Sequence, residues 1–371
     1  MPPGNRQTVV PQAAPGLRFE RFALQLSQAI STTLQDGVFV GGAAVVNFEA
    51  ELARYLGVEH VIGCNSGTDA LFLSLMAIGI GPGDEVIVPA LTAAATAVAV
   101  IRTGASPRFA DVSAETRNID AEAIMNAMTA SVRAIIVVHL HGRSADIGPI
   151  LEFGDAHSIP IIEDCAQAIG ATNGDQFVGT FGCLGAFSFY PTKNLGCLGD
   201  GGAVATNDPD IAARIRTARN YGWNDDRLTT SFGINSRLDA IQANVLSALL
   251  PELDAANAER RHAAQIYDAA FQGLDLNLPQ SVFGSVYHQY ALDLENPEQL
   301  GAYLLNAGYG TAAHYRLGLH EEPYFKRITG RSAHFPATEY LCKRLLSLPI
   351  QPELMDHQVG VIDAVKDYFS S

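Results

Sequence analysis

The sequence predicts an α/β fold with a mostly parallel central sheet flanked by helices, followed by a smaller C-terminal α+β domain. Two observations predict it. Short β-rich runs alternate with helical stretches through the first half of the chain, and those runs are continuously apolar rather than alternating. Such runs are typical of strands buried on both faces of a parallel sheet, and the strand–helix repetition is typical of α/β layers.

The first strands are expected at “EHVIGC” and “EVIVPA”, and the helical stretches “TDALFLSLMAIGI” and “TAAATAVAVIRTG” follow them. The pairs continue with “SPRFADV” and “NIDAEAIMNAMTA”, then with “VRAIIVVHLHG” and “DIGPILEFGDAH”. The run “PIIEDCA” leads into a loop, and further strands are expected at “GAFSFY” and “GGAVAT”. A helical pattern then covers 235–271, where Pro251 is expected to kink or break the helix.

The pattern changes after this long helix. The runs “YHQYALDLE”, “PEQLGAYLLNAG”, “YGTAAHY” and “LMDHQVGVIDAVKDYF” indicate a smaller α+β unit. We therefore expect a large domain at 1–250, which includes an N-terminal arm and helix over 1–36, and a small domain at 251–371. A chain of 371 residues is long enough for both.

Composition excludes several classes of protein. The net charge of −15 argues against a nucleic-acid partner, which needs a basic surface. The five cysteines are scattered without a CxxC pair, so we expect no metal site and a reducing compartment. The N-terminus lacks an apolar signal core, and no run approaches a membrane span. A cytoplasmic protein without a membrane partner is therefore predicted.

Two glycine-containing turns have different prospects as phosphate sites. “GIGPGD” follows a helix and precedes a strand, which is the wrong order for a phosphate-binding turn, so it is expected to be a helix stop. “CNSGTDAL” follows a strand and opens a helix, so its free backbone amides favour an anion, and Ser66 and Thr68 add hydroxyls. An ordinary N-cap is the alternative interpretation.

Asp164 ends the buried strand of “PIIEDCAQAIGA”. Ligands of open parallel sheets bind at that edge, and an aspartate there can pair with the protonated ring nitrogen of a pyridine cofactor. An N-cap and a metal ligand are the alternatives. Glu163 should point to the opposite face of the strand, so the two carboxylates form no chelating pair.

Lys193 lies between the apolar strand and the glycine-rich loop of “FSFYPTKNLGCLGDGGAV”. In isolation it would be interpreted as a surface lysine. Because it follows a phosphate turn and a strand-end aspartate in the same chain, we expect an amine with a lowered pKa that forms a Schiff base with an aldehyde.

Five segments together resemble a known family: “NSGTDAL”, “VPALT”, “IEDCAQAIGA”, “FSFYPTKNLGCLGDGGAV” and “GINSRLDAIQA”. They are similar to the pyridoxal phosphate (PLP)-dependent sugar aminotransferases of the DegT/DnrJ/EryC1/StrS group. The resemblance runs from about Gly37 to the C-terminus. It implies the fold type I architecture of the aspartate aminotransferase superfamily, with pyridoxal 5'-phosphate as cofactor.

The resemblance also implies roles for individual residues. Lys193 matches the lysine that binds the cofactor and then moves protons. Asp164 matches the partner of the ring nitrogen, and Gln167 matches the residue that contacts the ring hydroxyl. No metal is implied.

The cofactor phosphate is expected to be bound by Gly67, Thr68 and Ser188, and by Asn235 of the neighbouring subunit. The resemblance thus implies a homodimer with two composite sites. One departure concerns Ala93, which stands where the family usually has an aromatic residue stacked on the ring.

Substrate contacts are expected at Tyr190, His314, Tyr315 and His320, where structural roles are the alternative. Arg316 replaces the proline that usually follows the His-Tyr pair, and its charge could meet a nucleotide phosphate or an acidic sugar. “FYPTKNLG”, followed by “GDGG”, resembles the enzymes that aminate 3-keto rather than 4-keto sugars.

The predicted reaction moves an amino group from L-glutamate to a keto sugar nucleotide. A dTDP-linked 3-keto-6-deoxyhexose is the first expectation, in amino-sugar biosynthesis for lipopolysaccharide, another surface polysaccharide or a glycosylated metabolite. The alternatives are a 4-keto or 3-keto-uronic sugar on UDP or GDP, a PLP-binding regulatory homologue without turnover, and an α/β enzyme that binds a nucleotide without PLP.

Overall fold

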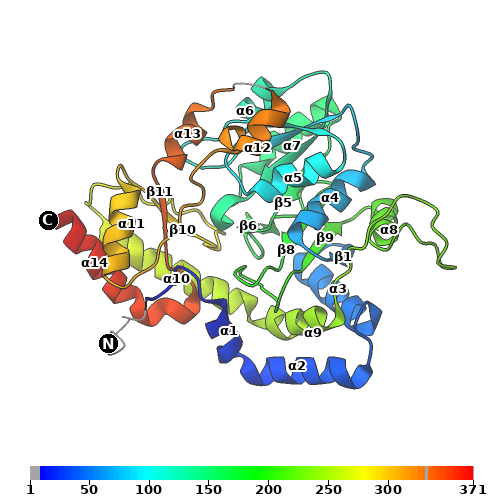
Figure 1. Ribbon diagram of the computed structural model, residues 1–371, viewed down its shortest axis with the longest axis horizontal. Coiled ribbons are helices and arrows are strands. Elements are labelled where there is room, and N and C mark those ends of the chain that lie inside the picture. The colour runs from blue at the N-terminus through cyan, green and yellow to red at the C-terminus, as the bar shows by residue number, and fades with distance from the viewer. Residues whose placement is uncertain (1–8, 331–332, 371) are drawn as a thin grey trace, which may run out of the picture.

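The computed structural model describes residues 9–330 and 333–370. An α/β body and a smaller group of C-terminal elements make up the molecule, and the long helix α10 (Leu253–Phe271) connects them (Figure 1). No helix in the described ranges is long and apolar enough to cross a membrane. The predicted α/β class is confirmed.

The central sheet has seven strands in the order β1-β9-β8-β5-β4-β2-β3. The pairs from β8 through β5, β4 and β2 to β3 are all parallel, whereas β9 runs antiparallel to both β8 and β1. The sheet is thus mostly parallel, as predicted, with one reversed strand. Its strands are β1 (His60–Cys64), β2 (Glu85–Pro89), β3 (Ser106–Ala110), β4 (Val132–Val138), β5 (Ile161–Asp164), β8 (Leu184–Ser188) and β9 (Gly202–Thr206).

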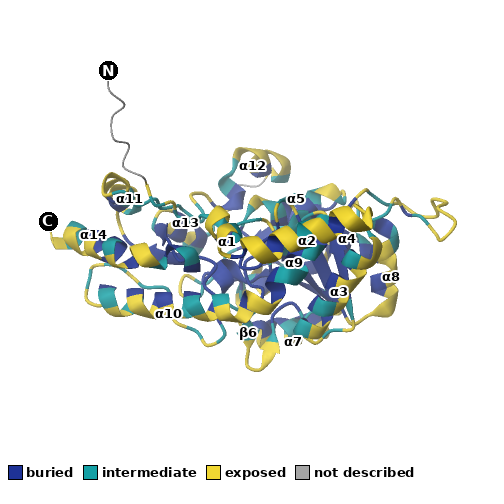
Figure 2. Cartoon of the chain, turned by 90° about the horizontal axis from the view of Figure 1, so that it is seen from below, coloured by how far each residue is buried: buried dark blue, intermediate teal, exposed yellow. Residues whose placement is uncertain are grey.

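Helices cover both faces of this sheet, which explains why its strands are apolar throughout. In β4, Ile136 and Val138 pack with α4 (Gly67–Ala77) and α5 (Ala94–Arg102). The intervening Ile135 and Val137 pack instead with α6 (Ala121–Ala127) and α7 (Ile147–His157). Viewed from below, the buried strands lie between the layer with α4 and α5 and the layer with α3 and α7 (Figure 2). The body also contains the helices α3 (Gly42–Leu56) and α8 (Pro209–Ala218).

The N-terminal segment forms two helices, α1 (Pro15–Arg21) and α2 (Ala23–Asp36), where one helix after an arm was expected. Residues 1–8 of that arm lie outside the described ranges. Helix α2 packs along α9 (Ala240–Leu249), and the two lie side by side in Figure 1.

The segment 235–271, whose pattern predicted a helix, is helical only in part. Residues 235–239 are extended, with isolated bridges from Asn235 and Asp239, and the helix begins at Ala240. Between α9 and α10 the α-helix is interrupted at Leu250–Glu252 by a 3-10 turn that contains Pro251, as predicted. The domain boundary near residue 250 falls on this turn and remains a prediction.

The C-terminal elements have a core of their own, built from α10, the antiparallel pair β10 (Tyr290–Asp293) and β11 (Leu345–Leu348), and two further helices, α11 (Pro297–Asn306) and α14 (Gln358–Ser370). Two short helices, α12 (Pro323–Thr329) and α13 (Pro336–Cys342), pack instead on the core of the large body. The loop expected after β5 contains a short hairpin, β6 (Thr172–Asn173) and β7 (Gln176–Phe177). Short 3-10 helices occupy Leu140–Gly142, Leu319–Glu321 and Pro352–His357.

Candidate active site

The residues predicted to bind the cofactor, except Asn235, come together at the carboxyl edge of the sheet. Asp164 is the last residue of β5 and Ser188 is the last of β8. Helix α4 begins three residues after β1, and Lys193 lies in the loop from β8 to β9. Because β5 and β8 are neighbouring parallel strands, their ends present side chains to one space, the usual ligand site of open α/β sheets.

The start of α4 leaves two backbone donors without a protein partner. The first amides of a helix have no intrahelical acceptor. Ser66 caps the helix: its Oγ accepts from the amide of Asp69 at 3.1 Å, and its carbonyl oxygen accepts from the amide of Ala70 at 2.9 Å. In the described part of the chain, no hydrogen bond uses the amides of Gly67 and Thr68. Both remain available for an anion at the positive end of the helix dipole.

Two glycines let the walls of this anion site approach each other closely. A Cβ on Gly67 would lie 2.6 Å from the Cβ and 3.1 Å from the Oγ of Ser188. A Cβ on Gly202, the first residue of β9, would lie 2.4 Å from the carbonyl carbon of Ser66. Side chains at either position would fill the cradle, so the arrangement brings Ser188 against the helix start as the sequence predicts.

Asp164 is buried and held by two donors. Its Oδ2 accepts from Thr96 Oγ1 at 2.9 Å, and its Oδ1 accepts from the amide of Ala166 at 3.1 Å. Because the proton of Thr96 goes to Asp164, Thr92 must donate to Thr96 across their 3.2 Å contact. Burial raises the pKa of Asp164, while the amide of Ala166, Thr96 and the charge of Lys193 oppose that rise. The two donors fix the carboxylate in position, and each of its oxygens keeps a lone pair that can accept from a cation.

Lys193 is half-buried, and desolvation lowers its pKa to about 8 although the nearby carboxylate of Asp164 acts in the opposite direction. Its main-chain amide donates to the carbonyl of Tyr190 at 2.8 Å. No side chain of the described residues holds its amino group. A lysine with this pKa has an appreciable neutral fraction near pH 7.5 and can act as nucleophile or base.

Gln167 connects the sheet edge with His314 and Tyr315 from the C-terminal part of the chain. Its Oε1 accepts from the amide of His141 at 2.7 Å, and its Nε2 contacts the hydroxyl of Tyr315 at 3.0 Å. His141 Nε2 in turn donates to the carbonyl of His314 at 3.1 Å. Tyr315 thus lies beside the predicted ring-hydroxyl residue, and no acceptor among the described residues takes the second proton of Gln167 Nε2, which is available for a ligand.

Three histidines beside Lys193 or Gln167 are neutral at physiological pH. Burial lowers the pKa of His141 and His288 well below 6.5 and that of His314 to about 4, and the charge of Lys193 adds to the effect at His288 and His314. Sequence reasoning missed His141 and His288, because nothing local links them to the site.

The tautomer of His288 can be derived from its partner. Asn194 uses both protons of its Nδ2 on Asn257 Oδ1 and the carbonyl of Val286, so its Oδ1 must accept from His288 Nδ1 at 3.1 Å. The unprotonated nitrogen of His288 is therefore Nε2.

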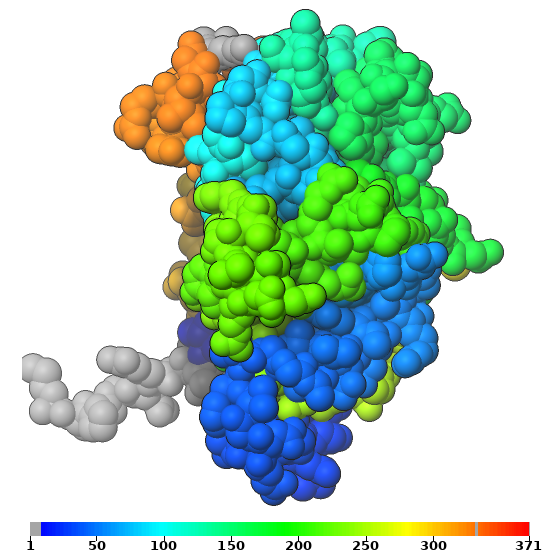
Figure 3. Space-filling model, turned by 90° about the vertical axis from the view of Figure 1, so that its right-hand side faces the viewer, coloured from blue at the N-terminus to red at the C-terminus, as the bar shows by residue number. Residues whose placement is uncertain are grey.

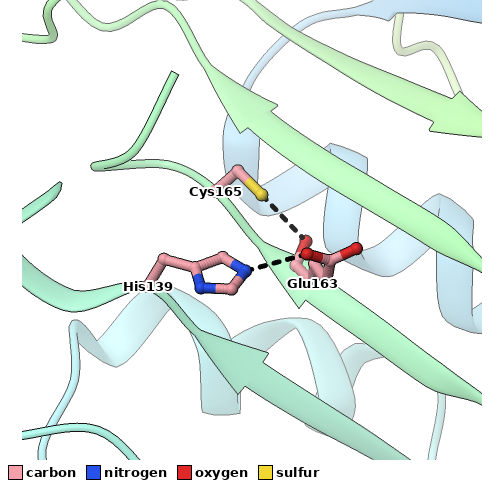
Figure 4. A group of neighbouring side chains, drawn as sticks. All are labelled: His139, Glu163 and Cys165. Carbon is pink, nitrogen blue, oxygen red and sulfur yellow. Dashed lines mark hydrogen bonds and ion pairs between the residues drawn. The ribbon is translucent and has the colours of Figure 1, made fainter. Parts of the chain in front are cut away.

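Glu163 faces the other side of the sheet edge, as its alternation with Asp164 predicts. Its carboxylate accepts from the amides of Gly179, Phe181 and Gly182 at 2.7–2.8 Å. His139 also points toward it: the amide of Ala145 donates to Nδ1, so the proton lies on Nε2 and is donated to Glu163 at 2.9 Å. Cys165 contacts only the main-chain oxygen (Figure 4). With four donors on Glu163, this buried group is a structural support rather than a set of free metal ligands.

The other predicted residues are more scattered. Tyr190 is 51% exposed. His320 is buried beneath α13, with Nε2 3.4 Å from Glu339 and its ring against Phe335. Asn235 is exposed on the extended segment before α9, and Arg316 is also exposed. Ala93, at the N-cap of α5, presents only a methyl group where the family usually has an aromatic ring. Roles for these side chains remain predictions.

Comparison with known proteins identifies the class. The model of the DegT/DnrJ/EryC1/StrS aminotransferase family matches residues 23–366, and the chain belongs to this family of PLP-dependent sugar aminotransferases. Family members bind PLP or its amine form. The anion cradle that a Cβ would fill, the fixed carboxylate of Asp164 and the lysine of lowered pKa fit such a cofactor.

Two curated relatives and one solved structure are similar over nearly the whole chain. A UDP-N-acetyl-3-dehydro-alpha-D-glucosamine 3-aminotransferase of Acidithiobacillus ferrooxidans is 41% identical, covering 97% of this chain and 98% of the relative. A dTDP-3-amino-3,4,6-trideoxy-alpha-D-glucose transaminase of Streptomyces venezuelae is 39% identical, with 94% and 93% covered. The crystal structure of S. venezuelae DesV in complex with a ketimine intermediate has a TM-score of 0.95 at 38% identity, with 98% and 99% covered.

Proposed function

We propose that this protein transfers the amino group of L-glutamate to the C3 keto group of a nucleotide-linked sugar. The observation that supports it best is the convergence of Lys193, Asp164 and the free amides of Gly67 and Thr68 at one edge of the sheet. PLP, when bound, supplies an electron-withdrawing ring that stabilises negative charge on the substrate carbon. The chain supplies binding, orientation and proton transfer.

In the proposed reaction, Lys193 acts as both the base and the acid. Its pKa of about 8 keeps part of the amine neutral at cytoplasmic pH, so Nζ can take a proton from the donor carbon and return one in the second half-reaction. Asp164 is positioned by Thr96 and Ala166 to stay close to a protonated ring nitrogen, and that cation would lower the pKa that burial raises.

Specificity for C3 is supported by the “FYPTKNLG” segment and by the two relatives, both of which are named for chemistry at C3. A dTDP-linked 3-keto-6-deoxyhexose is the substrate we propose first. A UDP-linked 3-keto sugar is the competitor, because the relative at 41% identity carries that name. We place the reaction in the cytoplasm, since all five cysteines are unpaired, as expected in a reducing compartment.

We further propose a homodimer in which Asn235 completes the phosphate site of the partner subunit. Asn235 is exposed, and so are apolar side chains of neighbouring segments: Phe39 before α3, Val46 within α3, and Leu228 and Phe232 in the loop between α8 and α9. The blue segment of α2 and α3 and the yellow-green loop after α8 lie side by side on one face of the molecule (Figure 3). An exposed apolar face of this kind favours association with another protein surface.

Subunit mixing tests this arrangement. Lys193→Ala and Asn235→Ala should each reduce activity alone. If Asn235 serves the partner's site, a mixed dimer contains one site with both Lys193 and Asn235 intact, so activity reappears on mixing the two variants after mild dissociation. Failure of mixing to restore activity, while wild-type subunits survive the same treatment, would place Asn235 in its own subunit's site or in none.

The substrate is tested directly with a panel of 3-keto and 4-keto sugar nucleotides on dTDP, UDP and GDP. Formation of 2-oxoglutarate from glutamate measures turnover, and NMR of the product gives the position of the new amine. Amination at C3 supports the proposal, and the preferred nucleotide decides between the two substrates. Amination at C4, or no turnover with any member while PLP binds, would contradict it.

A further inference from the structure

Arg18, on the N-terminal helix α1, reaches the main chain of Lys193. It is only 5% exposed, and its Nη1 donates to the carbonyl oxygen of Lys193 at 2.6 Å, a contact between residues 175 positions apart. No carboxylate of the described residues lies within ion-pairing distance of Arg18. Burial lowers its pKa, and the more distant charge of Glu353 offsets only part of that effect.

The N-terminal segment has several attachments besides this arginine. Ala14 and Gln351 exchange two hydrogen bonds, from the amide of Ala14 at 2.8 Å and to its carbonyl at 2.9 Å. Val10 exchanges backbone hydrogen bonds with Gly308 and Gly310 at 2.9 and 2.8 Å. Arg21, on the same helix, forms a bidentate ion pair with Glu259 at 2.8 and 3.0 Å. Burying an unpaired guanidinium costs free energy. Because other contacts already attach the segment, attachment alone does not explain why Arg18 is buried.

The contact completes a set of restraints around the lysine. The amide of Lys193 donates to Tyr190, and the side chain of the next residue, Asn194, is held by Asn257 on α10 and by the carbonyl of Val286. Arg18 restrains the carbonyl of Lys193 itself. The backbone of this turn is therefore restrained at several points, whereas no described side chain holds the amine of Lys193.

We propose that Arg18 is a positioning residue for Lys193, which fixes the peptide plane from which the lysine side chain extends. The inference rests on the proposed function: Nζ must leave the cofactor carbon and return to it in each half-reaction, so it must be presented from a constant origin. Without Arg18 the carbonyl can rotate, and a displacement of about 1 Å at a reacting atom is enough to slow chemistry about 100-fold.

The test compares Arg18→Met with Arg18→Lys and with the matched control Arg21→Met, which removes an exposed ion pair from the same helix. Stopped-flow absorbance with glutamate measures how fast the lysine-bound cofactor is consumed. We expect a rate at least about tenfold lower for Arg18→Met, with cofactor content and the KM for glutamate unchanged, partial recovery in Arg18→Lys, and wild-type rates in Arg21→Met.

A second readout uses the cofactor-free protein. Hydrogen exchange of the peptide that covers 190–196 should be faster in Arg18→Met and unchanged in Arg21→Met. Wild-type rates and exchange in Arg18→Met, or equal losses in both variants, would overturn the inference. If Arg18→Met does not fold, Arg18→Lys decides: slower amine transfer supports the inference, and wild-type transfer overturns it. A wild-type protein that never forms the lysine-bound absorbance band would refute the proposed function instead.

Discussion

Replacing Lys193 by methionine should stabilise the cofactor-free protein at neutral pH. The pKa of Lys193 falls from its ordinary 10.5 to about 8, chiefly through desolvation. That difference corresponds to roughly 3 kcal/mol against the charged amine in the folded state. Solvent reaches the half-buried side chain and reduces this to about 2 kcal/mol. Methionine keeps an unbranched apolar chain in the same space and carries no charge.

The direction of the pKa shift determines how the stability of the wild-type protein changes with pH. Well below pH 8 the amine is protonated in both states, so the full cost is present. Between pH 8 and 10.5 the folded protein releases its proton first, and wild-type stability rises with pH. Above 10.5 both states are neutral and the cost disappears. The advantage of Lys193→Met should therefore be constant well below pH 8 and fade as the pH rises from about 8 to 10.5.

Urea unfolding of both cofactor-free proteins at equal concentration, at pH 7 and at pH 10, measures this difference. Loss of the lysine also removes a cation near Asp164, so Asp164→Asn and the double variant close a cycle that isolates the coupling. Two results would refute the desolvation argument. One is a double variant that is less stable at pH 7 than Asp164→Asn alone, and the other is an advantage of Lys193→Met that does not change with pH.

The remaining predictions concern the supports of the site. Asp164→Asn should still bind cofactor through the phosphate cradle but lose at least about 100-fold in amine transfer, measured by single turnover with glutamate, because the ring nitrogen loses its charged partner. Gly202→Ala should weaken cofactor binding and cost about 1–3 kcal/mol in urea unfolding, since its Cβ would meet Ser66 at 2.4 Å. The control Gly148→Ala has nothing within 4 Å of the new methyl and should bind cofactor as wild type does. Glu163→Gln should cost about 3 kcal/mol, because an amide NH2 would replace an acceptor that faces backbone donors. Wild-type stability of that variant would show that its hydrogen bonds matter little.

The site was predictable where its residues are local in sequence. Asp164 at a strand end, Lys193 after the next strand and Gly67 at a helix start each combine a residue type with a position, and parallel strands bring such positions to one edge. Thr96 and His288 were missed because their contacts with Asp164 and Asn194 depend on the packing of distant segments.

In the fold, too, local patterns were predictable and features set by distant packing were not. Continuous apolar runs predicted the strands, but pairing decides their direction, so the antiparallel β9 could not be seen in its own residues. The helical pattern before Ala240 was misleading because residues Asn235 and Asp239 form isolated bridges with other segments instead. Arg18 had no local signal at all, since its partner lies 175 positions away.

The central claim is that Lys193 binds PLP through its amine. The chain has four lysines, Lys193, Lys326, Lys343 and Lys366, so the attachment point can be assigned without ambiguity. The protein is loaded with PLP, reduced with borohydride and digested, and mass spectrometry locates the fixed pyridoxyl group. We predict stoichiometric labelling of Lys193. Labelling of another lysine instead, or no label on a protein that is otherwise folded, would contradict the account.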